Sequence, residues 1–183
     1  MERLAEGLKL KLGNPAPYFS LKATDGRVYS LADFANKQVL VTIFTCNHCP
    51  YAQAYETRLV ELARFYQPRG VQFIAICANN ADAYPEDSFE KMVEKAKALA
   101  LPYPYLQDVD QNVAKAYDAQ CTPEVYMFNA ERKLIYHGRI DDNYQEPEKV
   151  TVHSLRDALD AVLSGEAPNP ALTSAVGCSI KWK

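Results

Sequence analysis

Two continuous apolar runs, QVLVTIF at 38–44 and VQFIAICAN at 71–79, lack the polar alternation of a half-exposed strand. Runs of this length and β-branched content are typical of strands buried on both faces of a sheet. The segment at 51–70 has helical spacing instead. Its apolar positions are Tyr55, Leu59, Leu62, Ala63 and Tyr66. A strand, a helix and a second strand in this order predict a βαβ unit with parallel pairing.

The hairpin and helix signals on either side extend this pattern. Asp25-Gly26 separates two short β-like runs within 16–31, which predicts a hairpin, and Ser30 is suited to cap a short turn after it. An amphipathic helix is expected at 87–100, where Asp87 and Glu90 have the spacing of a capping box.

The remaining elements follow in the second half of the chain. We expect a strand at 103–107, a brief helix at 110–118, an antiparallel hairpin at 124–140 and a helix at 151–165. The sum is an α/β fold, with a mixed central sheet flanked by helices and an N-terminal hairpin in front. We expect one domain over 1–183, in which 166–183 is a docked C-terminal tail.

Composition limits the classes of function. Hydrophobic residues make up 48% of the 183 positions, as in a globular protein, and the net charge of −3 gives no reason to expect nucleic acid as a partner. The opening MERLAEGLKLKLGN lacks the apolar run of a secretory signal, and no stretch is long enough to cross a bilayer. We therefore expect a cytoplasmic protein without membrane partners.

Two of the five cysteines, Cys46 and Cys49, are three positions apart where the first buried strand meets the first long helix. A helix N-terminus favours a thiolate over a thiol, so a cysteine there can become a nucleophile at neutral pH. An exposed Cys46 could attack a substrate disulfide, and Cys49 could resolve the mixed disulfide. His48 adds a cation or a donor near the sulfurs. Cys-x-x-Cys at this junction predicts a redox pair.

Thr122-Pro123 stands directly before a predicted strand, where proline marks an edge or a special turn, including one with a cis bond. Together with the hairpin and the Cys-x-x-Cys, it resembles the thioredoxin fold. Four segments narrow the resemblance to an uncharacterised peroxiredoxin-like branch of the redoxin (alkyl hydroperoxide reductase/thiol-specific antioxidant) superfamily. They are GNPAPYFSL, FTCNHCPY, DVDQNVAKAYDAQCTPEVYMF and GCSIKW.

The resemblance implies roles for single residues. Thr122 and Pro123 would form the cis-proline loop beside which substrate chains bind, and His48 would stabilise the reduced thiolate and make the pair a stronger oxidant than thioredoxin. The predicted supporting set is Thr45, Asn47, His48, Pro50, Thr122 and Pro123. The peroxidase pattern is incomplete, since Thr42 and Cys46 occupy the positions of its proline and threonine. The buried carboxylate of thioredoxins has no counterpart that the sequence locates.

The other cysteines have weaker signals. Cys77 lies within a buried strand and is expected to be a core residue. Cys121 and Cys178 are candidate extra redox thiols, the latter in a tail whose Ile180 and Trp182 suggest docking.

Three functions remain open on the sequence. The first is a thiol-disulfide oxidoreductase without a cofactor, acting through Cys46 and Cys49 on protein or small-molecule thiols and disulfides. The second is a peroxiredoxin-like antioxidant peroxidase that acts on peroxide, with Cys121 or Cys178 resolving. The third is a copper- or zinc-binding module, in which His153 would join the two cysteines. The oligomeric state is not predicted.

Overall fold

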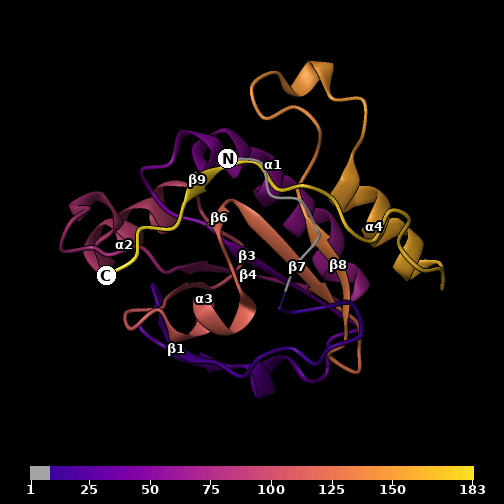
Figure 1. Ribbon diagram of the computed structural model, residues 1–183, viewed down its shortest axis with the longest axis horizontal. Coiled ribbons are helices and arrows are strands. Elements are labelled where there is room, and N and C mark those ends of the chain that lie inside the picture. The colour runs from indigo at the N-terminus through magenta and orange to yellow at the C-terminus, as the bar shows by residue number, and fades with distance from the viewer. Residues whose placement is uncertain (1–8) are drawn as a thin grey trace.

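The computed structural model describes residues 9–183, and its centre is a seven-stranded mixed sheet (Figure 1). The strand order is β2-β1-β5-β4-β3-β7-β8. The bounds are β1 Ser20–Ala23, β2 Val28–Ser30, β3 Val39–Phe44, β4 Val71–Cys77, β5 Tyr105–Gln107, β7 Glu124–Phe128 and β8 Leu134–Gly138. β3, β4 and β5 run parallel, whereas the hairpins β1–β2 and β7–β8 form the two antiparallel edges. The predicted mixed α/β sheet is confirmed.

The helices cover both faces of this sheet. The helices are α1 Pro50–Tyr66, α2 Phe89–Ala98, α3 Asn112–Tyr117 and α4 Ser154–Leu163, with 3-10 turns η1 Leu31–Phe34, η2 Gln67–Arg69, η3 Pro85–Asp87 and η4 Pro147–Lys149. Buried residues of α1, α2 and α4 pack with Val39, Val41 and Ile43 of β3. Those of α3 and η1 pack with Leu40 and Phe44, which face the other way along the same strand. Because β3 is buried on both sides, its sequence is continuously apolar.

Helix α2 begins later than its sequence indicates. The capping box expected from Asp87 is wrong, because Ser88 is the N-cap and its side chain accepts the backbone N–H of Lys91. Asp87 lies instead in η3 and is fully buried. The expected cap of the first turn is present, with Ser30 and Asp33 forming a capping box.

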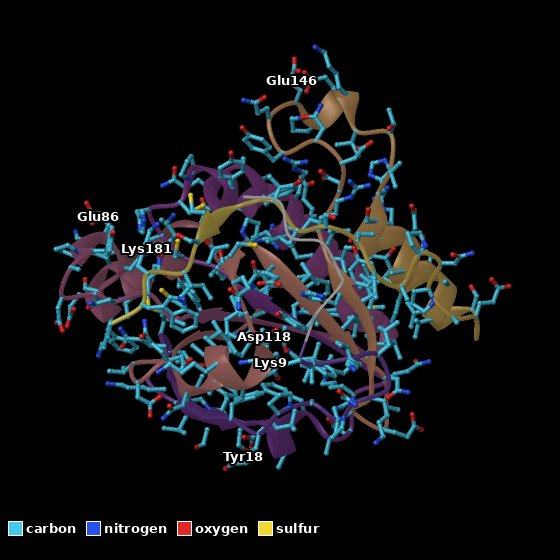
Figure 2. The ribbon with its side chains drawn as sticks, in the orientation of Figure 1. Lys9, Tyr18, Glu86, Asp118, Glu146 and Lys181 are labelled. Atoms are coloured by element: carbon cyan, nitrogen blue, oxygen red, sulfur yellow. The ribbon has the colours of Figure 1, made fainter. Side chains whose placement is uncertain are left out.

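The tail crosses the molecule after α4 and ends near α2 (Figure 1). Within it, β9 Cys178–Ser179 pairs antiparallel with β6 Cys121–Thr122, which precedes β7. The loop between β8 and α4, which carries Glu146, projects from the body (Figure 2). Over residues 9–183, the helices are all too short or too polar to cross a membrane. The opening segment in which we found no secretory signal lies largely in 1–8, outside the described residues.

Candidate active site

The predicted cysteine pair lies at the carboxyl end of β3, where the chain turns into α1. Thr45 continues the parallel pairing beyond β3 by donating its backbone N–H to the carbonyl of Ile76 at 2.9 Å. Cys49 is the N-cap of α1, and Pro50 occupies its first turn, where a missing N–H costs nothing. The loop 46–49 is therefore held between a buried strand and a helix N-terminus, as the sequence predicts.

A second segment, far along the chain, completes the pair's surroundings. The Thr122-Pro123 peptide bond is cis. Thr122 contacts both sulfurs: its hydroxyl lies 3.4 Å from Cys46 Sγ, and its carbonyl accepts from Cys49 Sγ at 3.2 Å. The structure thus brings together the two cysteines and the threonine-proline pair that the sequence places 73 or more positions away.

Both sulfurs are covered, and all five cysteines are free thiols. Cys46 is 2% exposed and Cys49 0%, so the expectation that Cys46 is exposed is wrong for this conformation. The tail strand β9 packs against the pair, with Cys178 at the edge of the same core cluster. Sequence reasoning could anticipate that the tail docks, but not where.

The two thiols of the pair differ in acidity. A hydrogen bond from the Cys46 thiol lowers the pKa of Cys49 to about 4, with help from Cys178, the backbone N–H of Ala52 and Thr122, and against the effect of burial. The pKa of Cys46 is raised, first by its hydrogen bonding to Cys49 and then by burial and the charge of Asp87. The lowered pKa makes Cys49 the thiol of the pair that loses its proton first, and in the structure this thiol still carries the proton that it donates to the Thr122 carbonyl. The nucleophile assignment made from sequence favoured Cys46.

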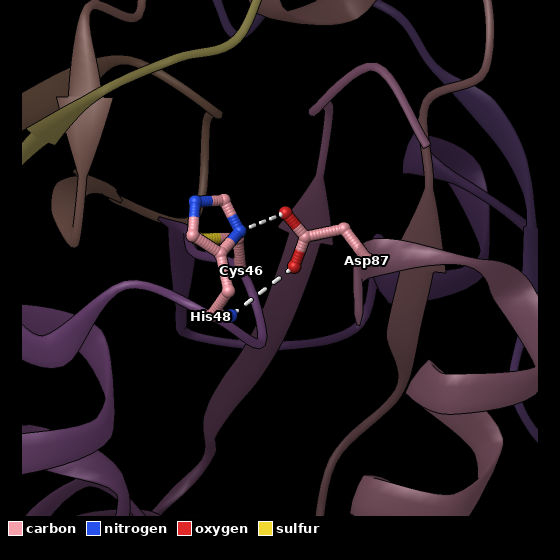
Figure 3. Close-up of side chains that lie close together, drawn as sticks. All are labelled: Cys46, His48 and Asp87. Atoms are coloured by element: carbon pink, nitrogen blue, oxygen red, sulfur yellow. Dashed lines mark hydrogen bonds and ion pairs between the residues drawn. The ribbon is translucent and has the colours of Figure 1, made fainter. Parts of the chain in front are cut away.

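The buried carboxylate beside this pair is Asp87 (Figure 3). Its Oδ1 accepts the backbone N–H groups of Asn47 at 2.6 Å and His48 at 3.3 Å. Its Oδ2 lies 2.6 Å from His48 Nδ1 and accepts from Asn79 Nδ2 at 2.7 Å. The His48 ring also stacks on Tyr84, with centroids 5.1 Å apart. Asp87 therefore holds the loop between the cysteines in place.

Sequence reasoning missed Asp87 because local spacing favoured a helix cap. The signal that could have identified it is its position after the second buried strand, whose carboxyl end meets that of β3 at the same sheet edge. Asp87 is a fully buried carboxylate whose charge raises the pKa of Cys46.

The rest of the loop is also fixed by hydrogen bonds. The Asn47 carbonyl accepts from Gln53 Nε2 at 2.8 Å and Lys95 Nζ at 2.9 Å, and Lys95 also pairs with Glu56. The Asn47 side chain accepts from the Tyr105 hydroxyl at 3.0 Å. Asn47 is thus a structural support of the loop rather than a reacting group.

One cluster of side chains matches part of the metal site that the third alternative would need. Ligand atoms of Cys46, His48 and Asp87 lie within 4.8 Å of one another. Both oxygens of Asp87 already accept N–H groups, so the cluster is satisfied by its own hydrogen bonds. His153, which the sequence offered as a further ligand, immediately precedes α4 and lines a separate cavity with Arg58 and Arg156.

The remaining cysteines lie in different surroundings. Cys77 is 1% exposed in β4, and burial raises its pKa to about 12, in keeping with a core residue. Cys121 Sγ lies 4.0 Å from Glu124 Oε2, and its side chain leaves β6 on the face opposite to Thr122. Cys178 is the one whose thiol interacts with Cys49.

The chain matches a known protein family over most of its length. The family model described as Redoxin matches residues 11–159. The chain belongs to the redoxin family.

The chain is similar in sequence to curated proteins and in structure to solved ones. Among curated proteins, the thiol-disulfide oxidoreductase ResA of Geobacillus thermodenitrificans is 26% identical over 131 residues, 70% of each chain. An uncharacterised conserved protein from Geobacillus kaustophilus has a crystal structure with a TM-score of 0.90, 44% identity and coverage of 100% of this chain and 95% of that one. A thioredoxin family thiol:disulfide interchange protein from Chlorobium tepidum, 19% identical with a TM-score of 0.58 over 68% of this chain and 83% of its own, shares the fold. The redoxin is thus thioredoxin-like, with thiol-disulfide oxidoreductases among its relatives.

Proposed function

We propose that this redoxin is a thiol-disulfide oxidoreductase whose redox centre is the Cys46–Cys49 pair. The observation that carries the proposal is the joint contact of both sulfurs with Thr122, at the N-terminus of α1. The clients would be thiols or disulfides of proteins or small molecules. Exchange between thiols and disulfides needs no cofactor, because the electrons move between sulfur atoms.

The exchange has two balanced steps. A client thiolate attacks Cys46 Sγ, the Cys46–Cys49 bond breaks, and Cys49 leaves as a thiolate. A second client thiolate then attacks the client sulfur of the mixed disulfide, and Cys46 takes up a proton. The client loses two electrons and the pair gains them. The reverse sequence reduces a client disulfide, with Cys49 resolving the mixed disulfide on Cys46.

The acidity of Cys49 supports this assignment of roles. A thiolate of low pKa is the faster leaving group, so attack on Cys46 is favoured over attack on Cys49. The hydrogen bonds that lower the pKa of Cys49 also stabilise the reduced pair. We therefore expect the redoxin to oxidise clients more readily than an unperturbed dithiol would.

The test is thiol counting with disulfide mapping after equilibration across glutathione redox buffers. Cys46 and Cys49 should oxidise together at one potential, and Cys46→Ser or Cys49→Ser should abolish that step. If neither thiol titrates while the protein stays folded, the proposal fails. Cys77→Ser is the matched control, because Cys77 is a core thiol in the neighbouring strand.

A second candidate, peroxide reduction, rests on the same lowered pKa, since a thiolate is the species that peroxide oxidises. The incomplete peroxidase pattern, with Thr42 and Cys46 in place of its proline and threonine, weighs against it. Peroxide consumption under a thiol reductant, compared between the unaltered protein and Cys49→Ser, separates the two activities.

A further inference from the structure

The tail is built into the site by a regular pattern of backbone contacts. Cys178 pairs with Thr122 and Ser179 with Cys121 across the β6–β9 ladder. The ladder continues beyond the strand, where the Ile180 N–H donates to the Gln120 carbonyl at 2.9 Å. The tail strand therefore occupies the edge of the segment whose carbonyl contacts Cys49 Sγ.

Gly177 sets the approach of this strand. A Cβ atom at position 177 would lie 2.1 Å from the Thr122 carbonyl oxygen and 2.6 Å from its carbonyl carbon, both backbone atoms. No real Cβ contact is that short, so any larger residue must push the tail away from β6. Only glycine permits the register that presents Cys178 beside Thr122.

In this register, the Cys178 side chain packs against the redox pair. Cys178 belongs to the residues packed on the cluster that contains Cys46 and Cys49. It lies opposite Thr122, the residue that contacts both sulfurs of the pair, and its thiol and that of Cys46 each change the pKa of Cys49. Cys49 is thus the thiol that interacts with both of the others, as exchange at its sulfur requires.

We propose that Cys178 is a third redox thiol of this site, which exchanges with the Cys46–Cys49 disulfide to form a Cys49–Cys178 disulfide. The inference rests on the proposed function. The Cys178 thiolate attacks Cys49 Sγ, the Cys46–Cys49 bond breaks, and Cys46 leaves as a thiolate that takes up the proton released by Cys178. The Cys178 sulfur is formally oxidised by one electron and the Cys46 sulfur is reduced by one, so the oxidation level of the chain is unchanged.

The charges in the site favour this step only in the oxidised state. In the reduced protein, burial and then the hydrogen bond and charge of Cys49 raise the pKa of Cys178 to about 11, which keeps it a neutral donor. Once Cys49 is in a disulfide, its negative charge is gone, and with it two causes of that raised pKa. The main cause of the raised pKa of Cys46 is removed as well. Oxidation therefore makes Cys178 a better nucleophile and removes the largest obstacle to a thiolate on Cys46, although burial and the charge of Asp87 still oppose that thiolate.

The experiment uses the full chain carrying Cys46→Ser, incubated with glutathione disulfide and mapped by mass spectrometry under non-reducing conditions. Cys49 and Cys178 should lose two hydrogens together and appear as one linked pair of peptides, with two glutathiones released. Cys49 carrying glutathione while Cys178 remains a thiol would overturn the inference.

A matched pair of tail variants shows whether the strand delivers the thiol. In the Cys46→Ser background, Gly177→Ala should lower the linked fraction at least several-fold and raise the glutathione adduct on Cys49. Ser179→Ala changes an exposed side chain of the same strand and should leave the linked fraction unaltered. An equal linked fraction in both variants would contradict delivery by the β6–β9 ladder. Circular dichroism confirms that each variant is folded.

Disulfide mapping of the unaltered protein distinguishes failure of this inference from failure of the proposed function. If its mapping shows Cys46–Cys49 while Cys46→Ser gives no Cys49–Cys178, the oxidoreductase stands and the inference fails. If Cys49–Cys178 forms in Cys46→Ser but Cys46–Cys49 appears at no potential, the proposed pair fails and Cys178 is the redox partner of Cys49.

Discussion

At the scale of single residues, Asp87 combines two effects that oppose each other at the redox pair. Its carboxylate accepts the backbone N–H groups of Asn47 and His48, which fixes the loop between the cysteines. The same negative charge raises the pKa of Cys46. Asp87 therefore orders the site while it disfavours a thiolate on Cys46.

Asp87→Asn is expected to separate these effects, because asparagine keeps an oxygen acceptor but loses the charge. The charge of Asp87 acts on Cys46, so the pKa of Cys46 should fall by about one unit, which corresponds to about 1.4 kcal/mol. Thiol alkylation rates as a function of pH measure the pKa. Glu86→Gln removes an exposed charge of the same turn and serves as the control. An unchanged pKa in Asp87→Asn would contradict the electrostatic role.

The pH dependence of stability tests the acidity of Cys49. Its pKa is about 4 in the folded protein, below that of an ordinary thiol, so between those values the unfolded chain binds more protons than the folded one. The stability that the thiolate contributes is fully present above the unfolded pKa and is lost as pH falls toward 4. Urea unfolding of the reduced protein should therefore show stability rising from pH 5 to pH 8, by about 1–3 kcal/mol more than in Cys49→Ser. Equal slopes in the two proteins would place the thiolate elsewhere.

At the scale of elements, the β6–β9 ladder packs against the site, and we expect it to limit access to the sulfurs. Because Gly177→Ala must displace β9 from the Thr122 carbonyl, it should expose Cys46 and Cys49. We expect their alkylation by a bulky maleimide to accelerate about tenfold or more, while far-UV circular dichroism stays unchanged. Ser179→Ala should react like the unaltered protein. If Gly177→Ala alkylates no faster, another element covers the sulfurs.

How much the sequence predicts differs between elements. β3, α1 and the two hairpins were predictable because their hydrophobic period and turn residues agree with their burial. The Asp25-Gly26 turn, for example, does join β1 to β2. Asp87 was misassigned because capping spacing is a local signal, whereas its partners Asn47 and His48 lie 39–40 positions earlier. The position of β9 has no local signal at all, since its two-residue ladder depends on how closely Gly177 can approach β6.

At the scale of the whole molecule, the site lies where four separate stretches of chain meet. Cys46 and Cys49 leave β3, Asp87 follows β4, Thr122 precedes β7, and the tail brings Cys178. The tail then binds the same network, because the Lys181 N–H donates to Asn79 Oδ1 at 2.9 Å and Asn79 bonds Asp87. Lys181 and Glu86 of η3 lie on the same side of the molecule (Figure 2). Tail docking and loop geometry are therefore coupled through Asn79 and Asp87.

Because the four stretches meet at the redox pair, the free energy of unfolding of the whole protein should depend on whether the pair is reduced or oxidised. The bonds from Cys46, Cys178 and Ala52 to the Cys49 thiolate exist only in the reduced, folded protein. The dithiol form should therefore unfold at a higher urea concentration than the Cys46–Cys49 disulfide form at pH 7, by a few kcal/mol at most. By linkage, that difference equals the shift in reduction potential between folded and unfolded chains, at about 30 mV per 1.4 kcal/mol.

The advantage of the dithiol form should shrink as pH falls toward 4, where Cys49 takes up its proton. A variant with both Cys46→Ser and Cys49→Ser should show no such difference between oxidising and reducing buffers. A disulfide form more stable than the dithiol at pH 7 would mean that the fold favours oxidation of the pair, and that the redoxin acts on its clients as a reductant.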